Sequence, residues 1–299
     1  MNQVEGNIKK GIACIFLAGI GFSLMTFFVR LSGDLPTMQK TFFRNFVALI
    51  IATISLLKTQ EKFYIKRASF KDIFWRCAFG TSGMICNFYA IDHLEIADAN
   101  MLNKMSPFYA VLLSIPLLKE KPNYVDIIST VVAFIGAMFI VRPSGNNISL
   151  IPSLIGLYGG IGAGAAYVFV RRLGRIKERT SVIVFCFSAF SCLVTLPFLL
   201  IDYHAMSFRQ IGCLLLAGSC AALGQFSITS AYKYAPAKEL SVFDYIQVIF
   251  ATLWGLIFLH ELPHRLSFVG YFIIIATSIF RWYYTKERDK REKNKQKVS

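Results

Sequence analysis

The chain contains ten apolar runs of about 20 residues each, separated by loops too short to form a soluble domain. A backbone in lipid must satisfy its own hydrogen bonds, so each run is predicted to be a membrane-spanning helix. Only 16% of the residues are charged, against about 25% in an ordinary soluble protein. The expected fold class is therefore all-α, an integral membrane protein with ten transmembrane helices. The runs lie at 11–30, 38–57, 73–92, 95–117, 124–141, 153–171, 181–201, 210–231, 237–259 and 266–284.

The net charge of +15 is distributed unevenly along the chain. If the N-terminus is cytoplasmic and the chain crosses the membrane ten times, most of the 32 Lys and Arg residues lie on the cytoplasmic side, as the positive-inside rule requires. We therefore expect a multi-pass protein of the cell membrane, the inner membrane in a bacterium, with both termini in the cytoplasm. The basic tail 286–299 contains acidic residues and follows a membrane span, so we expect it to contact anionic membrane lipids, and we expect no nucleic-acid partner.

Neither the cysteines nor the histidines indicate a cofactor, a catalytic site or a metal site. The seven cysteines lie within or at the edge of apolar runs and none forms a C-x-x-C pair, so we interpret them as small buried apolar residues. The string from His260 to His264, H-E-L-P-H, matches a zinc-protease motif that needs both histidines on one helical face. Pro263 lies inside the string and disrupts a helix, so we predict that the helix stops here.

An internal repeat organises the chain. A shift of 141 residues superposes an L-x-E-x-P pattern at 118–122 on the same pattern at 259–263, and maps the third to fifth apolar runs onto the eighth to tenth. A shift of 145 aligns the first run with the sixth. We predict two five-helix repeats, 1–148 and 149–285, followed by the basic cytoplasmic tail 286–299. Because five is an odd number of crossings, the two repeats are predicted to have opposite orientations in the membrane.

A set of signature residues accompanies this repeat: Pro36 eight residues before Arg44, Tyr89-Ala90, Pro107, the L-x-E-x-P pattern and Gly136. In these residues the chain resembles the EamA family of the drug/metabolite transporter superfamily, although its second half lacks an arginine that matches Arg44. The resemblance implies a ten-helix, two-repeat importer or exporter with both termini cytoplasmic. It also implies a central cavity lined by the first, third, fourth, sixth, eighth and ninth spans. No particular substrate is implied, since the family is similar to carriers for amino acids, nucleotide-derived metabolites, vitamins and drugs.

Lys104 lies inside the fourth apolar run, about 14 Å from its outer end at the rise of an α-helix. A lysine at that depth costs about 2.5–3.5 kcal/mol on insertion scales, so a lipid-facing position is disfavoured. The shift of 141 maps Asn103 onto Asp244 in the ninth run, and a pseudo-two-fold axis would bring Lys104 and Asp244 to opposite walls of one cavity. Lys104 is predicted to bind a carboxylate or phosphate of the substrate. Asp244 is predicted to bind a cationic group or a coupling proton. Asn103 and Gln247 are predicted to form hydrogen bonds with the substrate. A structural salt bridge, or a lysine extended towards the loop, is the alternative.

Other polar residues within the apolar runs are further candidates for the substrate cavity. Each of them could instead form hydrogen bonds between helices. Arg44 lies nearer one end of its run. We interpret it as one of three things: a structural anchor, a contact to lipid headgroups or a substrate residue. The further cavity candidates are Asn87, Tyr167, Gln225 and Tyr245.

Gly156, Gly160 and Gly164 recur every four residues in the sixth run. In lipid, a stripe of small residues lets two helices approach closely. We therefore predict close helix packing along this stripe.

These observations favour a secondary active transporter that moves a small organic solute across the membrane by alternating access. The sequence contains no nucleotide-binding string and no catalytic constellation, so an enzyme is not expected. A membrane-embedded enzyme or a lipid scramblase is the alternative class. The expected partners are a small-molecule substrate and membrane lipids, and the sequence leaves homodimer formation open.

Overall fold

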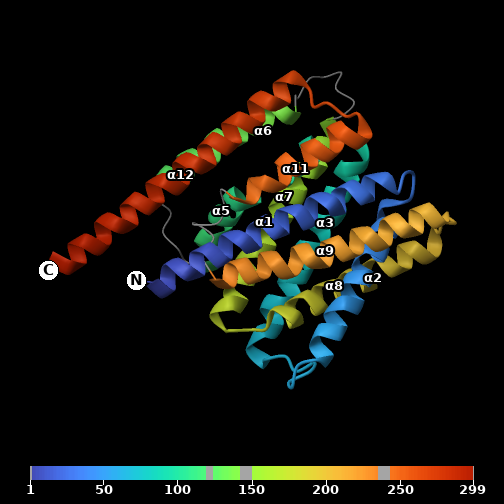
Figure 1. Ribbon diagram of the computed structural model, residues 1–299, viewed down its shortest axis with the longest axis horizontal. Helices are drawn as coiled ribbons and strands as arrows, with labels where there is room; N and C mark the ends of the chain where they lie inside the picture. Colours follow the sequence, from blue (N-terminus) through green and yellow to red (C-terminus); the bar gives the residue numbers. More distant parts are fainter. Residues whose placement is uncertain (1, 119–123, 142–149, 235–242, 299) are drawn as a thin grey trace.

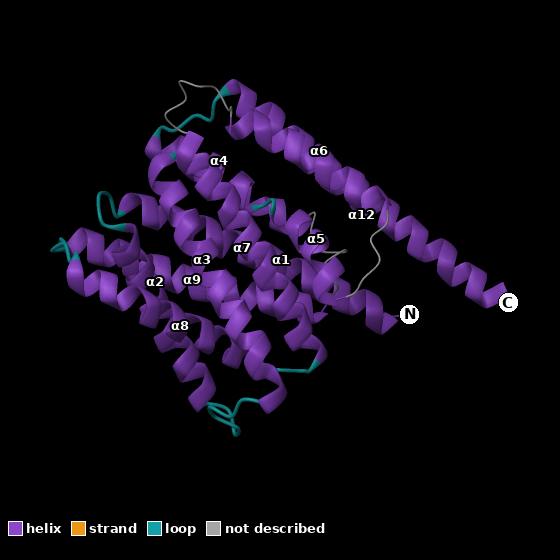
Figure 2. Cartoon of the chain, turned by 180° about the vertical axis from the view of Figure 1, so that it is seen from behind, coloured by secondary structure: helices purple, strands orange, loops and turns teal. Residues whose placement is uncertain are grey.

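The computed structural model describes residues 2–118, 124–141, 150–234 and 243–298. Within these ranges the chain is helical and contains no strand, which confirms the predicted all-α class (Figure 2). The longer helices are α1 (Asn2–Leu31), α2 (Thr37–Leu57), α3 (Phe70–His93), α4 (Ile96–Asn103), α5 (Ser106–Leu118), α6 (Tyr124–Val141), α7 (Leu150–Arg175), α8 (Thr180–Ile201), α9 (Phe208–Tyr234), α11 (Ile246–Trp254) and α12 (Arg265–Val298).

Six of the described helices contain segments that are long and apolar enough to cross a membrane, and two shorter apolar helices accompany them, at Ile127–Ile140 and Phe243–Leu259. Helix α3 has 24 residues but is not among the six, since polar residues such as Arg76 and Asn87 lower its hydropathy. The protein is therefore a multi-pass membrane protein. The six segments are Lys9–Leu31, Thr37–Leu57, Leu150–Arg175, Thr180–Ile201, Phe208–Ala231 and Arg265–Arg288.

The distribution of side chains is the reverse of that in a soluble protein. Large apolar residues lie on the outer surface, and Leu200 and Phe272 are 75% and 74% exposed. Charged residues lie inside, where Arg44 and Lys104 are each only 2% exposed. An apolar exterior is stable in hydrocarbon, whereas buried charges require partners or a polar cavity.

The helices pair across the two halves of the chain. Helix α1 packs along α9, α3 along α7, α2 along α8, and α6 along α12. Figures 1 and 2 show α6 and α12 as a pair along one edge of the molecule, while α1, α3, α7 and α9 form its centre. The start of α1 and the end of α12 lie on the same side (Figure 1).

The fourth apolar run is not one continuous helix, which corrects our expectation for 95–117. Helix α4 ends at Asn103, Lys104 and Met105 form a turn, and α5 begins at Ser106. Pro107 explains the break, because it has no N–H to donate to the carbonyl of residue 103 and its ring clashes with that carbonyl. At the second position of α5, however, the missing donor has no cost.

The second half is also irregular at the corresponding place. Residues Phe243–Tyr245 form a 3-10 turn before α11, and Gly255–Leu259 follow as a π-helix. Residues 235–242, just before Phe243, lie outside the described ranges. The expected repeat boundary at 148/149 and most of the first L-x-E-x-P pattern, residues 119–122, lie outside them as well. His260 has a positive φ of 54° and α12 begins only at Arg265, so the H-E-L-P-H string is not helical, as predicted.

The glycine stripe of α7 packs against the broken helix, which confirms the predicted close contact. A methyl group at Gly160 would lie 2.7 Å from the carbonyl oxygen of Leu102, and one at Gly164 would lie 2.7 Å from that of Ser106. Both carbonyls flank the Lys104 turn. The stripe therefore lets the α7 backbone touch the backbone on either side of the break.

We predict that Gly164→Ala lowers the melting temperature of the purified protein, because the new methyl group clashes with the Ser106 carbonyl and the Tyr109 side chain. Overpacking of this kind costs about 1–3 kcal/mol. Gly174→Ala is the matched control, since it lies on the same helix with no atom within 4 Å of the added carbon. Equal melting temperatures for the two variants in detergent would contradict the close contact.

Candidate functional site

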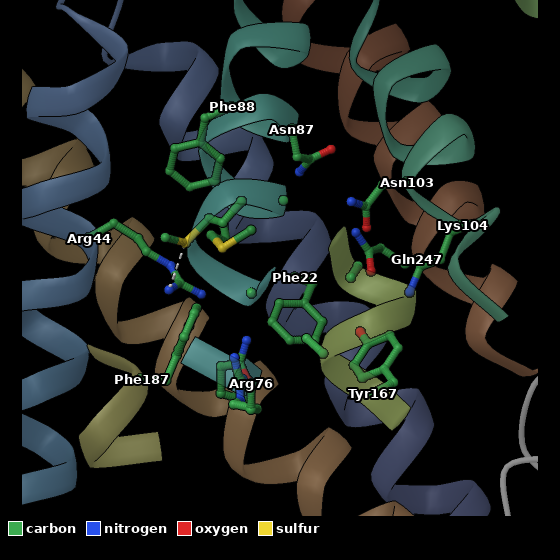
Figure 3. A pocket seen from close by; sticks show the side chains of 17 residues that line it. Phe22, Arg44, Arg76, Asn87, Phe88, Asn103, Lys104, Tyr167, Phe187 and Gln247 are labelled. Atoms are coloured by element: carbon green, nitrogen blue, oxygen red, sulfur yellow. Dashed lines mark hydrogen bonds between the residues drawn. The ribbon is translucent and has the colours of Figure 1, made fainter. Parts of the chain in front are cut away.

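A polar pocket lies in the centre of the molecule, where the broken helix meets α1, α2, α3, α7, α8, α9 and α11. Its volume is about 90 Å³, and residues from both halves of the chain line it (Figure 3). Phe22 of α1 and Phe88 of α3 contribute apolar walls. Six of the eight predicted site residues line this pocket: Asn87, Asn103, Lys104, Tyr167, Gln225 and Gln247.

Lys104 and Asp244 form a buried ion pair. The Lys104 Nζ lies 2.7 Å from the Asp244 Oδ1, and the two side chains are 3% and 1% exposed. Asp244 is not among the lining residues, so Lys104 stands between it and the pocket. The interpretation of Lys104 as a side chain extended towards the loop is therefore wrong. The salt bridge that was the alternative to opposite cavity walls is present, and Asp244 does not form a wall of this pocket.

Tyr245 lies outside the pocket and stabilises the turn between α4 and α5. Its hydroxyl donates a hydrogen bond to the Lys104 carbonyl oxygen at 3.2 Å and accepts one from the Ser278 hydroxyl at 3.1 Å. A backbone carbonyl freed by a helix break needs such a partner in a membrane. Tyr245 does not line the pocket, and its contacts are structural in this conformation.

The amide side chains divide into paired and unpaired groups. Gln247 donates from Nε2 to the Asn100 Oδ1 at 2.5 Å, and Asn100 in turn donates to the Ile96 carbonyl oxygen at 2.7 Å. The sequence interpretation missed Asn100, although it lies one turn before Lys104. The buried Oδ1 of Asn87 has no hydrogen-bond partner among the described residues, so it can accept a hydrogen bond from a ligand.

Two arginines also line the pocket: Arg44, for which a substrate role was one of three interpretations, and Arg76, which the sequence interpretation missed. Arg44 of α2 and Arg76 of α3 are 2% and 5% exposed. The interpretation of Arg44 as a contact to lipid headgroups is therefore wrong. Between them lies Phe187 of α8, whose ring centroid is 3.9 Å from the Arg76 Cζ and 6.0 Å from the Arg44 Cζ. Figure 3 shows these three side chains on one side of the pocket and Lys104, Gln247 and Tyr167 on the other.

Ion pairs hold the helix ends together on one side of this pocket. The Arg30 Nη2, at the end of α1, lies 2.8 Å from the Glu261 Oε1, and its Nη1 donates to the Ile91 and Asp92 carbonyl oxygens. The Lys40 Nζ lies 2.5 Å from the Asp92 Oδ1. Since Glu261 also accepts from the backbone N–H at the start of α4, this network connects α1, α2, α3 and α4.

A second set of ion pairs lies at the other end of these helices. The Arg172 Nε, near the end of α7, is 3.2 Å from the Asp72 Oδ2 in the first turn of α3. The Arg179 Nε is 3.2 Å from the Glu61 Oε2 and connects the loop after α7 to the loop after α2. The pocket therefore lies between two sets of salt bridges.

Among the described residues, no group of three or more His, Cys, Asp and Glu side chains is arranged to hold a metal ion. All seven cysteines are free thiols. His260 and His264 lie in the irregular segment before α12.

This architecture, with an apolar exterior around a buried polar pocket, is that of a multi-pass membrane transporter. The EamA-like transporter family matches the chain twice, over residues 9–142 and 150–282. The chain therefore belongs to the EamA-like transporter family, as the signature residues indicated.

Named relatives are transporters as well. The chain is 31% identical to the pseudopaline exporter CntI of Pseudomonas aeruginosa over 274 residues, which cover 91% of this chain and 95% of that protein. It is 25% identical to a riboflavin transporter of Brucella anthropi, over 82% of this chain and 88% of the relative. A crystal structure with 13% identity superposes with a TM-score of 0.65 and covers 92% of this chain and 96% of the other, which shows a shared fold.

We predict that Lys104→Met and Asp244→Asn each destabilise the protein, because each leaves one buried charge without its partner. Loss of one member of a buried ion pair costs about 3–5 kcal/mol. The double variant is expected to be more stable than the sum of the two losses implies. Thermal unfolding in detergent measures this coupling. The control is Glu61→Gln, which breaks a weak surface ion pair, since the Glu61 side chain is 64% exposed. Strictly additive losses would contradict the pair.

Proposed function

We propose that this protein is a secondary active transporter that moves a small organic solute across the cell membrane by alternating access. The central observation is the buried polar pocket, which lies between two sets of ion pairs and is lined by both halves of the chain. A solute bound there would be reached from one side or the other as the ion pairs at one end separate. Opening at one end and closing at the other is the defining requirement of alternating access.

Two inverted five-helix repeats are part of this proposal. The helix packing supports it. If each helix is exchanged for its equivalent in the other repeat, α1 for α7 and α3 for α9, the contact of α1 with α9 becomes the contact of α7 with α3. The same exchange maps the contacts of α2 with α8 and of α6 with α12 onto themselves. A packing pattern that survives exchange of the halves is expected of a pseudo-two-fold axis. Ten crossings with both termini cytoplasmic agree with α1 beginning and α12 ending on one side (Figure 1).

The site residues divide into two roles in this proposal. Asn87, Asn103, Tyr167, Gln225 and Gln247 contact the solute from the pocket walls. The Lys104–Asp244 pair, which is formed in this conformation, is proposed to change partners when the solute binds. A substrate carboxylate or phosphate competes with Asp244 for the Lys104 ammonium, and a proton or cationic group on Asp244 releases that lysine. Asp244 is therefore the proposed site for proton coupling.

The relatives support transport but do not identify the solute. The names of the relatives described above refer to export of pseudopaline and transport of riboflavin. We propose neither compound as the solute of this protein. Because these relatives are named as transporters and not as enzymes, an enzymatic role is not proposed.

We predict solute counterflow in reconstituted vesicles. A thermal-stability screen of the purified protein against anionic, neutral and cationic metabolites identifies a ligand, because binding to the folded state raises its stability. Vesicles preloaded with the unlabelled ligand are expected to accumulate the labelled ligand transiently above its external concentration. Lys104→Ala and Asp244→Asn should each lower the initial rate by about tenfold or more, since each removes a charged contact. Equilibration without transient accumulation would indicate a channel and contradict the proposal.

We also predict that locking the Arg30–Glu261 contact stops transport. Arg30→Cys and Glu261→Cys, in a variant without the seven native cysteines, are joined by a short bis-methanethiosulfonate, which forms a disulfide with each thiol and releases methanesulfinate. Counterflow should fall to the level of empty vesicles and return when the link is reduced. The single-cysteine variants treated with the same reagent are the controls. Full counterflow through the linked protein would show that this end of the helices does not separate during transport.

A further inference from the structure

We propose that the pocket binds its solute by a carboxylate or phosphate group held between the guanidinium groups of Arg44 and Arg76. The proposal rests on the transport function above and specifies the class of solute, an organic anion. It adds an anion contact on the arginine side of the pocket, beside the one proposed at Lys104, and Arg76 on that side was not a sequence candidate. On that side, two helices and the Phe187 ring bring two buried cations together (Figure 3).

The two guanidinium groups have only neutral partners. The Arg44 Nη1 donates to the Asn45 Oδ1 at 2.5 Å and to the Met84 Sδ at 3.2 Å. The Arg76 Nη2 donates to the Gln225 Oε1 at 3.4 Å. The Nε atoms of both arginines are buried and have no hydrogen-bond partner among the described residues. Each guanidinium group therefore has unused donor capacity.

No carboxylate of the described residues balances these charges. Asp72 lies one turn before Arg76 on the same helix, but its Oδ2 pairs with the Arg172 Nε at 3.2 Å instead. Asp244 pairs with Lys104. Arginine stays charged in proteins, and a buried charge without a counter-ion is costly. An anionic ligand would remove this cost, since planar guanidinium groups match carboxylate and phosphate oxygens.

The surroundings of Arg76 are shaped for its guanidinium group. The ring of Phe187 stacks with it at 3.9 Å, a distance typical of a cation–π contact. Gly80, one turn further along α3, leaves room for the group, because a side chain there would collide with the Arg76 Nη1. Both Gly80 and Phe187 line the pocket. The guanidinium group is thus held at the pocket wall by the Phe187 ring and the Gln225 contact, which leave its Nε hydrogen available.

The opposite side of the pocket adds a second requirement. The Asn87 Oδ1 lacks a partner and accepts a hydrogen bond, while Asn103 and Gln247 present further amides. A solute that satisfies both sides carries an anionic group at one end and a hydroxyl, amino or amide donor at the other. Two negative charges, as in a dicarboxylate or a phosphate monoester, would balance both arginines.

Anion binding is tested on the purified full-length protein by thermal unfolding at constant ionic strength. The probes are inorganic phosphate and glutarate, and glutaramide is the neutral match for glutarate. We expect phosphate or glutarate to raise the melting temperature saturably and glutaramide to leave it unchanged. In Arg44→Gln and Arg76→Gln the apparent Kd should rise by about tenfold or more each. Arg209→Gln, an exposed arginine of α9, is the control and should respond as the wild type does.

The ligand-free proteins separate a binding role from a structural one. Removing a buried charge that has no counter-ion should leave the ligand-free melting temperature of Arg44→Gln unchanged or raise it. A lower melting temperature together with an unchanged response to the anions would assign the arginines to structure and overturn the proposal. No saturable response of the wild type to either anion would overturn it as well. Arg44→Lys keeps the charge but loses the planar fork, so its affinity should lie between those of the wild type and Arg44→Gln.

The outcomes for the two proposals are distinct. Counterflow of a neutral solute at a rate unaffected by Arg44→Gln and Arg76→Gln would overturn the anion site and leave the transport function standing. Saturable anion binding without counterflow of any ligand would support the anion site and contradict the transport function.

Discussion

The ion pair between Lys104 and Asp244 is the interaction on which the centre of this protein depends. It joins the two halves of the chain at 2.7 Å, and both side chains are almost completely buried. A charge inside a membrane needs a partner, and here each half supplies the partner for the other. The two halves must therefore stay in register for either charge to be stable. Because Lys104 also lines the pocket, the same interaction connects the packing of the halves to the contents of the cavity.

The pair is possible because the backbone is broken where Lys104 lies. Pro107 prevents a continuous helix, and the resulting turn frees the Lys104 carbonyl, which accepts a hydrogen bond from the Tyr245 hydroxyl. Lys104 and Tyr245 are equivalent under the repeat shift of 141, so the two repeat-equivalent positions contact each other. The glycine stripe of α7 fits against the same turn. Irregular backbone is thus buried in protein and lines a cavity, the only setting in which a membrane tolerates it.

The balance of charge distinguishes the two sides of the pocket. Lys104 has a carboxylate partner in the protein, whereas Arg44 and Arg76 have neutral partners and an aromatic ring. The Lys104 side is therefore suited to exchange one partner for another during a transport cycle. At the arginine side, by contrast, an anion would find no protein carboxylate to displace. This asymmetry follows from the repeats themselves, because the second half has no arginine that matches Arg44.

The sequence by itself determined the class of protein, its family and the closeness of Lys104 to Asp244, with their salt bridge as one of two interpretations. These follow from local properties: apolar length decides membrane insertion, and depth together with repeat register brings two charges to one level. The arginine cluster, Asn100 and the break in the fourth run depended on the tertiary structure. Arg44 and Arg76 lie on different helices, and only helix rotation and packing bring both to Phe187. A proline such as Pro107 could have indicated the break, but only the neighbouring helix supplies the partners that make it stable.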